Sequence, residues 1–365
     1  MKEKIKVGIL FGGKSAEHEV SVQSAKNIYE AIDKNTYNVT MIGISKKGQW
    51  VIDHNFEKGI IPTYVESPEN AEDALALVTG PGEKQFIALT GTNALEKLDV
   101  IFPVLHGPFG EDGTVQGLLK LANIPFVGAG VLGSAVGMDK DVMKRLLRDA
   151  KLPNARHVLL QKYTGGEKNP DFQEITALLG LPLFVKPANL GSSVGISKVN
   201  NEEEFHQAVA EAFKYDHKLI VEEAITGREI ECSVLGNENP IASIPGEVIN
   251  LKGFYSYDAK YIEENASIVE IPAKLTPEEI ARVQETAVRT FKVLCCEGLA
   301  RVDVFLAPAG EVIVNEINTI PGFTKISMYP KLWRESGISY GELIDRLIRL
   351  ALEKFHRDME LKTSR

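Results

Sequence analysis

The sequence has 365 residues, a net charge of −9, 44% hydrophobic residues and 25% charged residues. These values are ordinary for a soluble globular protein of two or three domains. The acidic balance argues against a nucleic-acid or membrane-surface partner. Neither a signal peptide nor a bilayer-spanning apolar stretch is present, so we expect a cytoplasmic protein. The three cysteines lack metal-type spacing, and their odd number argues against a disulfide framework.

The first third of the chain predicts a parallel α/β sheet. Residues 4–11 form a short apolar run, residues 15–32 have helical periodicity and residues 39–45 form a second apolar run. This is a βαβ opening. Further elements are expected as weak strands within 62–91, strands over 100–105 and 125–127, and a helix over 114–122.

The remainder predicts alternating helices and strands. Thr276 and Ser339 are each followed by Glu three residues later, the pattern of a capping box. Expected helices are 138–151, one capped by Asn201, 276–294 and one beginning after Ser339; expected strands are 183–185, 196–199, 219–221 and 230–235.

Two apolar runs flank a turn cluster at 307–310, which predicts a β-hairpin. If the hairpin pairs symmetrically about Ala309–Gly310, Asp303 lies opposite Glu316 and Arg301 lies opposite Asn318. Two opposed carboxylates repel each other, and a hard dication removes that conflict.

Carboxylates and an amide carbonyl are oxygen ligands that Mg²⁺ takes while it also holds phosphates. The alternative is a solvated polar face on an edge hairpin. The turn at 319–322 follows at once and can offer backbone N–H groups near the carboxylates, which favours a functional site.

Two nucleotide-binding patterns do not fit their context. Residues 8–15 match the P-loop pattern, but Gly8 lies inside the first strand, where the loop cannot wrap a phosphate. Residues 128–133 match the dinucleotide fingerprint, but the strands before them are not a Rossmann start. We interpret 128–133 as a hinge into a second domain.

Other candidate residues lie at element ends. Lys186 ends a strand just before the glycine-rich loop 191–195, where lysine and backbone N–H groups can hold phosphate; a plain turn is the alternative. Lys140 is a second candidate cation or a solvated helix lysine. Glu17 suits a ligand ammonium group, or only a helix dipole, and His106 ends a strand.

Residues 252–265 carry four aromatic residues without regular period, typical of a lid or of a surface loop.

Taken together, eight motifs resemble those of D-alanine–D-alanine ligases, members of the ATP-grasp superfamily. They occur in the order and spacing of that family, from Gly12 to about Pro330: GGKSAEHEVS, HGPFGEDG, MDK, KPANLGSSVG, EEAITGREIE, YDAKY, RVDVF and NEINTIPGFT. One departure is Asn189–Leu190, where many relatives carry a charged pair.

The resemblance implies an α/β fold, α+β in its ATP-grasp part. A Rossmann-like N-terminal domain would span 1–128. A central ATP-grasp subdomain would span 129–221, and a C-terminal one with the metal site and a lid at 252–265 would span 222–365. It also implies a cytoplasmic homodimer that makes D-alanyl-D-alanine for peptidoglycan, through a D-alanyl phosphate.

The resemblance also implies the roles of individual residues. Two Mg²⁺ or Mn²⁺ would be held by Asp303, Glu316 and Asn318. ATP would be bound by Lys140, Lys186, Ser192, Ser193, Glu222, Glu223, Ala224, Ile225, Glu229, Lys260, Asn315 and Glu316. Catalysis would rest on Glu17, Ser192, Tyr261, Arg301 and Gly322. The substrates would be bound by Glu17, His106, Lys260, Ser327 and Met328.

Three alternatives stay open at this point. One is another ATP-grasp carboxylate–amine ligase, one a D-alanine–D-hydroxy acid ligase, and one a nucleotide-binding module without turnover. Related ligases that make the D-lactate ester lack the tyrosine found here as Tyr261, so we expect the amide.

Overall fold

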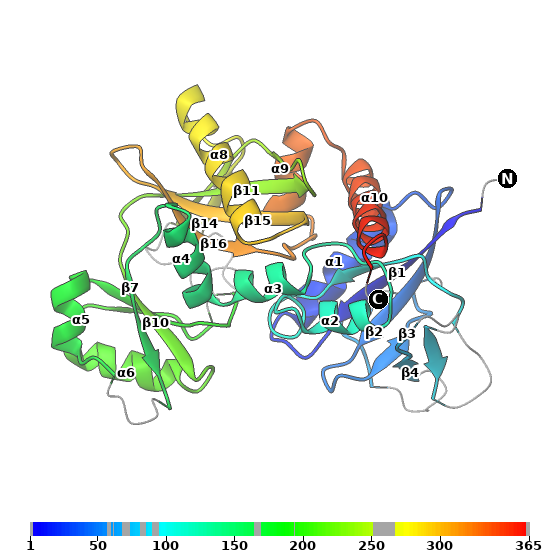
Figure 1. The fold of residues 1–365 in the computed structure, drawn as a ribbon, viewed down its shortest axis with the longest axis horizontal. Helices are drawn as coiled ribbons and strands as arrows, with labels where there is room; N and C mark the ends of the chain where they lie inside the picture. The colour runs from blue at the N-terminus through cyan, green and yellow to red at the C-terminus, as the bar shows by residue number, and fades with distance from the viewer. Residues whose placement is uncertain are drawn as a thin grey trace.

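The computed structural model describes residues 3–56, 60, 62–67, 74–80, 85–89, 95–163, 169–192, 194–250 and 267–362. Three β-sheets organise this part of the chain (Figure 1). Within it, no helix combines the length and the apolar character needed to cross a membrane.

The first sheet has the strand order β5-β4-β3-β2-β1-β6. Its strands are β1 (Ile5–Gly12), β2 (Tyr37–Ile44), β3 (Trp50–Ile52), β4 (Ala74–Leu77), β5 (Phe86–Ala88) and β6 (Val100–Val104). β1 runs parallel to both β2 and β6, and helix α1 (His18–Ala31) connects β1 to β2. The predicted βαβ opening is confirmed.

One prediction for the segment that follows this sheet is wrong. Residues 125–127 make one isolated bridge, between Ile101 and Phe126, and no strand. Gly128 adopts φ +101°, which ends the extended run after Val127. The segment 128–133, expected to be a hinge, includes the start of a helix that was not predicted, α3 (Val131–Met138), and its role as a hinge stays a prediction. The other helices of this region are α2 (Thr114–Leu121) and α4 (Lys140–Asp149).

The second sheet is antiparallel, with the order β7-β10-β8-β9. Its strands are β7 (His157–Gln161), β8 (Leu183–Pro187), β9 (Ser197–Val199) and β10 (Lys218–Glu223), and its helices are α5 (Phe172–Leu179) and α6 (Glu202–Ala212). Asn201 accepts a hydrogen bond from the Glu204 N–H at 3.0 Å, as its predicted cap role requires. The glycine-rich loop joins β8 to β9.

The third sheet, also antiparallel, has the order β14-β13-β11-β15-β16. Its strands are β11 (Arg228–Gly236), β13 (Gly246–Asn250), β14 (Ser267–Glu270), β15 (Gly298–Leu306) and β16 (Val312–Asn318), with β12 (Ile241–Ala242) paired to β11. Helix α8 (Pro277–Val293) begins at the predicted Thr276–Glu279 capping box. Met143 and Leu147 of α4 share a core with this sheet.

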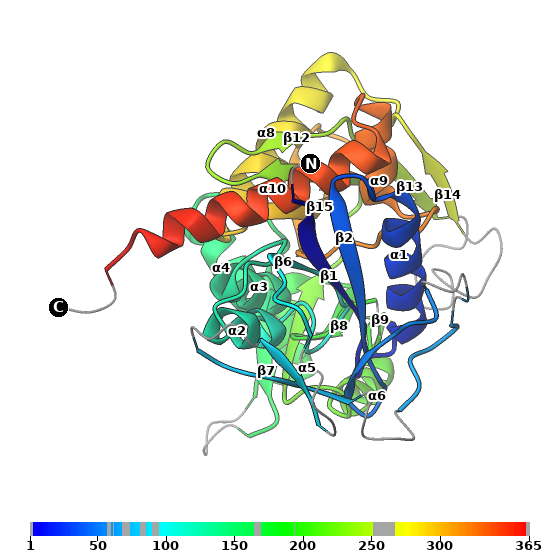
Figure 2. The same ribbon diagram turned by 90° about the vertical axis from the view of Figure 1, so that its right-hand side faces the viewer.

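The chain then returns to the first sheet. After α9 (Met328–Glu335), helix α10 (Tyr340–Met359) packs against β6 of the first sheet and against α1, and Figure 2 shows it crossing near the ends of β1 and β2. Leu343, Ile344 and Leu347 are fully buried in one core with Val7 and Ile9 of β1. The first sheet therefore owes part of its core to the last helix. The domain limits given above stay a prediction.

The β15–β16 hairpin has the predicted residue pairs at the site, but its register was not predicted. Asp303 pairs with Glu316 and Arg301 with Asn318, as expected, but Val304 pairs with Val314. The register therefore shifts between Asp303 and Val304, and Asn315 is the extra residue of a β-bulge. The strands do not pair symmetrically about Ala309–Gly310.

The bulge has a direct effect on side-chain direction. Val312 and Val314 are buried in the core, and the next buried residue of β16 is Ile317 rather than Glu316. Because side chains alternate along a strand, an unbroken β16 would point Glu316 into the core. The bulge instead brings Glu316 to the polar face that carries Asp303.

Candidate active site

Acidic side chains from three neighbouring strands gather around one arginine. Arg301 donates to both carboxylate oxygens of Asp303 at 2.7 Å, and its Nε lies 2.9 Å from Glu231 of β11. Asn318 Nδ2 donates to Asp303 at 3.0 Å. Burial alone would lower the pKa of Arg301, but Asp303 and Glu231 outweigh it and raise the pKa well above its usual value. Arg301 is therefore always charged.

This group suits a hard cation. Asp303 and Glu316 face each other on adjacent strands, and Asn318 follows on the same face. In the described part of the chain no three His, Cys, Asp or Glu side chains form a ready metal-binding group. Two carboxylates with one amide are nevertheless the oxygen donors that Mg²⁺ takes when water or phosphate completes its shell. The residues present fit the expected ion.

A second group has the opposite balance of charge. Glu222 of β10 lies 2.9 Å from Lys144 Nζ and 2.6 Å from Lys186 Nζ. Burial favours the neutral carboxyl, but the two lysines outweigh it and lower the pKa of Glu222 to about 2. One carboxylate thus faces two cations.

Lys140 connects the two groups. Its Nζ donates to Leu190 O at 2.7 Å and lies 3.8 Å from Glu316 Oε2. The same side chain therefore contacts the start of the glycine-rich loop and the acidic face of the third sheet. Lys140 and Lys186, the two cations expected at phosphate, both lie beside carboxylates that restrict their positions.

The first sheet contributes Glu17. Ser192 of the glycine-rich loop donates a short hydrogen bond to a Glu17 carboxylate oxygen, across 175 positions of sequence. Ser192 has φ +53°, a left-handed conformation that is uncommon for residues other than glycine. A Cβ at Gly107 would lie 3.0 Å from the other Glu17 oxygen, so Gly107 is needed for this close approach. Glu17 and Ser192, predicted to act together, are in contact.

His106 lies at a junction between the first sheet and the turn after β16. Its Nδ1 is 3.0 Å from Ile320 O and its Nε2 is 3.2 Å from Ser24 Oγ. Burial lowers the pKa of His106, against the opposing effect of the Glu17 charge. A neutral ring must then donate from Nδ1 to the carbonyl and accept from Ser24 at Nε2.

Glu111 makes a second link to the same turn. Its carboxyl oxygens accept from the Gly107 N–H at 2.7 Å and the Ile320 N–H at 3.1 Å. Burial, and then the charge of Glu17, raise the pKa of Glu111 to about 8. Phe323, two residues beyond Pro321, donates its N–H to Ser24 at 3.2 Å. The turn that carries Gly322 is thus held from both sides.

Gly322 and Ser327 are packed together. A Cβ at Gly322 would lie 2.7 Å from Ser327 Oγ, so no other residue fits without a shift. Ser327 accepts from the Thr324 N–H at 3.0 Å. The Met328 side chain is buried in a core with Val248, so only its backbone can serve a substrate.

The expected adenine hinge is only partly exposed. Glu223 is bound by Arg156 through its carboxylate, and the Ala224 N–H donates to Pro182 O at 3.2 Å. A cleft of about 690 Å³ beside the hinge is lined by Ile225 among others, but none of Lys140, Lys186 or Glu316 lines it. Glu229 lies on β11 opposite Phe305, two residues from Glu231.

Three residues expected at the site, Ser193, Lys260 and Tyr261, lie outside the described residues, as does the whole of the expected lid at 252–265. Their roles stay predictions.

Sequence reasoning missed three residues of this region. Lys144 is four residues from Lys140, hence on the same helix face, and that spacing could have indicated it. Glu231 alternates with Glu229 along β11 and could have been found by strand period. Glu111 lies in the HGPFGEDG motif, but its link to Ile320 depends on contacts remote in sequence.

Comparisons with known proteins agree with this geometry. The family model described as "D-ala D-ala ligase N-terminus" matches residues 6–129, and the one described as "D-ala D-ala ligase C-terminus" matches residues 146–349. A D-alanine–D-alanine ligase of Oceanobacillus iheyensis is 54% identical over 99% of both chains.

Solved structures point the same way. The D-alanine–D-alanine ligase of Coxiella burnetii has a TM-score of 0.83 and 38% identity, covering 98% of this chain and 97% of its own. The D-Ala:D-Ser ligase VanG of Enterococcus faecalis has a TM-score of 0.83 and 37% identity, covering 96% of this chain and 100% of its own. These likenesses confirm the expected α/β fold with an ATP-grasp part. The chain belongs to the D-alanine–D-alanine ligase family.

Proposed function

We propose that this protein joins two molecules of D-alanine into D-alanyl-D-alanine at the expense of ATP, for peptidoglycan precursor synthesis. One observation carries the proposal most directly. Side chains from all three sheets converge, because Ser192 binds Glu17 while Lys140 bridges Leu190 and Glu316. A ligase needs this arrangement, since it must hold a nucleotide and two amino acids together.

ATP is the co-substrate of the proposed reaction. Lys140 and Lys186 bind its phosphates, and backbone N–H groups of the glycine-rich loop close over them. Asp303, Glu316 and Asn318 would hold two Mg²⁺ or Mn²⁺, which would supply positive charge to the phosphates when bound. Residues 222–225 bind the base, and Glu229 binds the ribose.

The first step makes a mixed anhydride. A carboxylate oxygen of the first D-alanine attacks the γ-phosphorus, the bond from that phosphorus to the bridging oxygen breaks, and ADP leaves. Glu17 holds the ammonium group of this D-alanine, supported by Ser192 and by the predicted contact to Tyr261. His106, neutral and held by Ser24, keeps the turn at 320–323 in place beside it.

The second step forms the amide. The uncharged amine of the second D-alanine attacks the acyl carbon, its extra proton is lost, and inorganic phosphate leaves. Arg301 and the N–H of Gly322 stabilise the oxyanion that develops on the acyl oxygen. Ser327 and the Met328 N–H hold the carboxylate of the second D-alanine.

A different second substrate is the main competing proposal. VanG, 37% identical to this chain, is a D-Ala:D-Ser ligase. The deciding experiment measures phosphate release from ATP with D-alanine alone, with D-alanine plus D-serine and with D-alanine plus D-lactate, and identifies the products by mass. D-alanyl-D-alanine should be the main product. Phosphate release that does not depend on D-alanine would contradict the proposal.

The setting of the enzyme is also proposed. A cytoplasmic homodimer agrees with the family, and size-exclusion chromatography with light scattering tests the dimer.

A further inference from the structure

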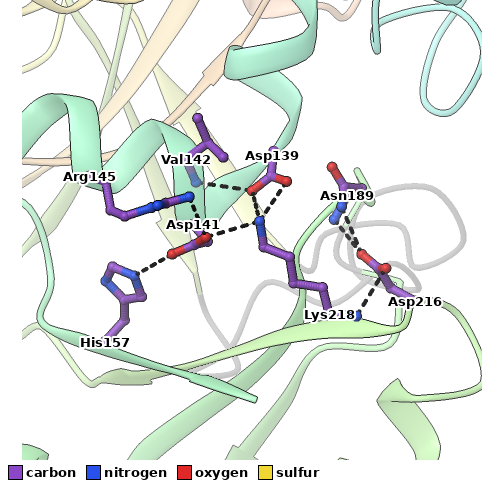
Figure 3. A network of polar contacts seen from close by, with 8 residues as sticks. All are labelled: Asp139, Asp141, Val142, Arg145, His157, Asn189, Asp216 and Lys218. Atoms are coloured by element: carbon purple, nitrogen blue, oxygen red, sulfur yellow. Dashed lines mark hydrogen bonds and ion pairs between the residues drawn. The ribbon is translucent and has the colours of Figure 1, made fainter. Parts of the chain in front are cut away.

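Lys218 occupies a junction that the proposed mechanism does not use. It begins β10, and its side chain extends between two carboxylates at the start of α4, those of the N-cap Asp139 and of Asp141 in the first turn (Figure 3). Its Nζ lies 2.8 Å from both oxygens of Asp139 and 3.0 Å from Asp141. These two carboxylates flank Lys140 in the sequence.

Helix α4 contacts both the third sheet and the loop that follows β8 of the second sheet. Its Met143 and Leu147 pack in the core of the third sheet. Its first residue instead contacts the loop that follows β8: the Lys140 N–H donates to Ala188 O at 3.0 Å, and Lys140 Nζ donates to Leu190 O. The helix start therefore sets the spacing between the second and third sheets.

The same loop is held from its other side by the residues around Lys218. The Ala188 N–H donates to Lys218 O at 2.9 Å. Asp216 accepts from the Asn189 N–H at 2.9 Å, from Asn189 Nδ2 at 3.1 Å and from the Lys218 N–H at 3.1 Å (Figure 3). Residues 188–190 thus lie between Lys140 and the 216–218 segment, and Lys218 joins both sides.

The charges at this junction have a consequence for an anionic ligand. Burial alone would lower the pKa of Lys218, but Asp139 and Asp141 outweigh it and raise the pKa. Lys218 is therefore a permanent cation. Without it, the two carboxylates beside Lys140 would attract Lys140 and repel phosphate. His157 and Arg145 also contact Asp141, at 3.3 Å and 3.1 Å, but neither is within reach of Asp139 in the contacts of the described residues.

We propose that Lys218 is a positioning residue for the nucleotide: it neutralises Asp139 and Asp141 and holds Lys140 in register with the start of the glycine-rich loop. The inference rests on the proposed function only in that ATP phosphates bind Lys140. The same loop is also held at Asn189, whose N–H and Nδ2 both donate to Asp216.

The experiment measures the Kd of ADP by titration calorimetry in magnesium buffer. Lys218→Met should raise the Kd about tenfold, as expected for a partly buried charge near the ligand, and should raise KM for ATP more than it lowers kcat. Lys218→Arg should stay within about threefold of the unmodified protein, because it keeps the charge. Lys214→Met, which removes an exposed lysine paired to Glu211 three positions away, is the matched control and should bind normally.

A second variant tests the charge of Asp139 separately from its role as the cap of α4. Asp139→Asn removes a carboxylate but keeps the cap that accepts the Val142 N–H, since Asn caps helices as well as Asp. The double variant Lys218→Met/Asp139→Asn should recover part of the lost affinity, and Asp139→Asn alone should bind ADP at least as tightly as the unmodified protein. Normal binding by Lys218→Met, or weaker binding by Asp139→Asn alone, would overturn the inference. An unmodified protein that binds no ADP would instead refute the proposed function.

Discussion

Two charge clusters lie close together at the site, and they differ in sign. Around Arg301, the carboxylates of Glu231 and Asp303 outnumber the one guanidinium. Around Glu222, two lysines outnumber the one carboxylate. The first cluster suits a metal cation and the second suits phosphate, so the Mg²⁺ form of ATP complements both.

The clusters also differ in burial. The side chains of Lys144 and Glu222 are 1% and 4% exposed, whereas that of Glu316 is 28% exposed. The difference suggests separate roles: the acidic face is open for chemistry, and the Glu222 cluster contributes to folding as well as to binding. Each prediction below tests one side of this contrast.

The largest effect is expected from Glu316→Gln. It removes a charge from the acidic face with little change in volume, so D-alanine-dependent phosphate release should fall at least about a hundredfold while the free energy of unfolding changes little. Glu311→Gln, in the exposed hairpin loop, is the control. Near-normal phosphate release by Glu316→Gln would refute the metal assignment.

Glu222→Gln, unlike Glu316→Gln, should lower the free energy of unfolding. It leaves Lys144 and Lys186 buried without a countercharge, which should cost about 3 kcal/mol of unfolding free energy in denaturant titrations. Glu223→Gln, whose carboxylate pairs with the exposed Arg156, should cost less than about 1 kcal/mol. Equal losses of unfolding free energy in both variants would show that the buried Glu222 cluster is no more important for folding than an exposed ion pair.

Glu111 predicts a pH dependence of stability. Its pKa is raised from 4.5 to about 8 in the folded protein, so the folded state binds this proton more tightly than the unfolded chain does. The free energy of unfolding should therefore fall as pH rises from 4.5 to 8. Because part of the side chain is exposed, we expect a loss of about 2 kcal/mol, which Glu111→Gln removes. Denaturant midpoints at pH 5 and 8.5 check this; equal pH dependence in both proteins would argue against it.

The smallest effect concerns Ser192. Ser192→Gly and Ser192→Ala both remove the hydroxyl, so they differ only in how well they tolerate the left-handed backbone at this position. Because glycine adopts a positive φ without strain, Ser192→Gly should be more stable than Ser192→Ala by about 0.5–1 kcal/mol. Both variants should weaken D-alanine binding by losing the contact to Glu17. A Gly variant no more stable than the Ala variant would show that the conformation carries little strain.

The sequence was sufficient for much of the fold and of the acidic face. Strand alternation placed Asp303, Glu316 and Arg301 on one side, and the capping pattern located the start of α8. The bulge at Asn315 could not be predicted, because the sequence around it has no distinctive turn residue. The correct pairing was therefore predicted from a symmetric hairpin that the protein does not form.

Contacts between segments far apart in the sequence were the second kind of feature that could not be predicted. The bond from Ser192 to Glu17 and the link from Glu111 to Ile320 join segments far apart in the chain, and neither leaves a local pattern. Helix α3 was missed for a local reason, since its glycines weaken helix propensity. Gly133 is nevertheless required there, because a Cβ would lie 2.5 Å from Cys295 O.

The return of α10 to the first sheet affects how the protein can be made. During synthesis the ribosome delivers β1 and α1 first, but the helix that completes their core begins at Tyr340. The apolar surface of Val7 and Ile9 therefore stays partly uncovered while the two further sheets are synthesised. Growing chains that expose such surface are prone to aggregation and are the usual clients of chaperones. In this protein the N-terminal region is the first to be synthesised and among the last to complete its core.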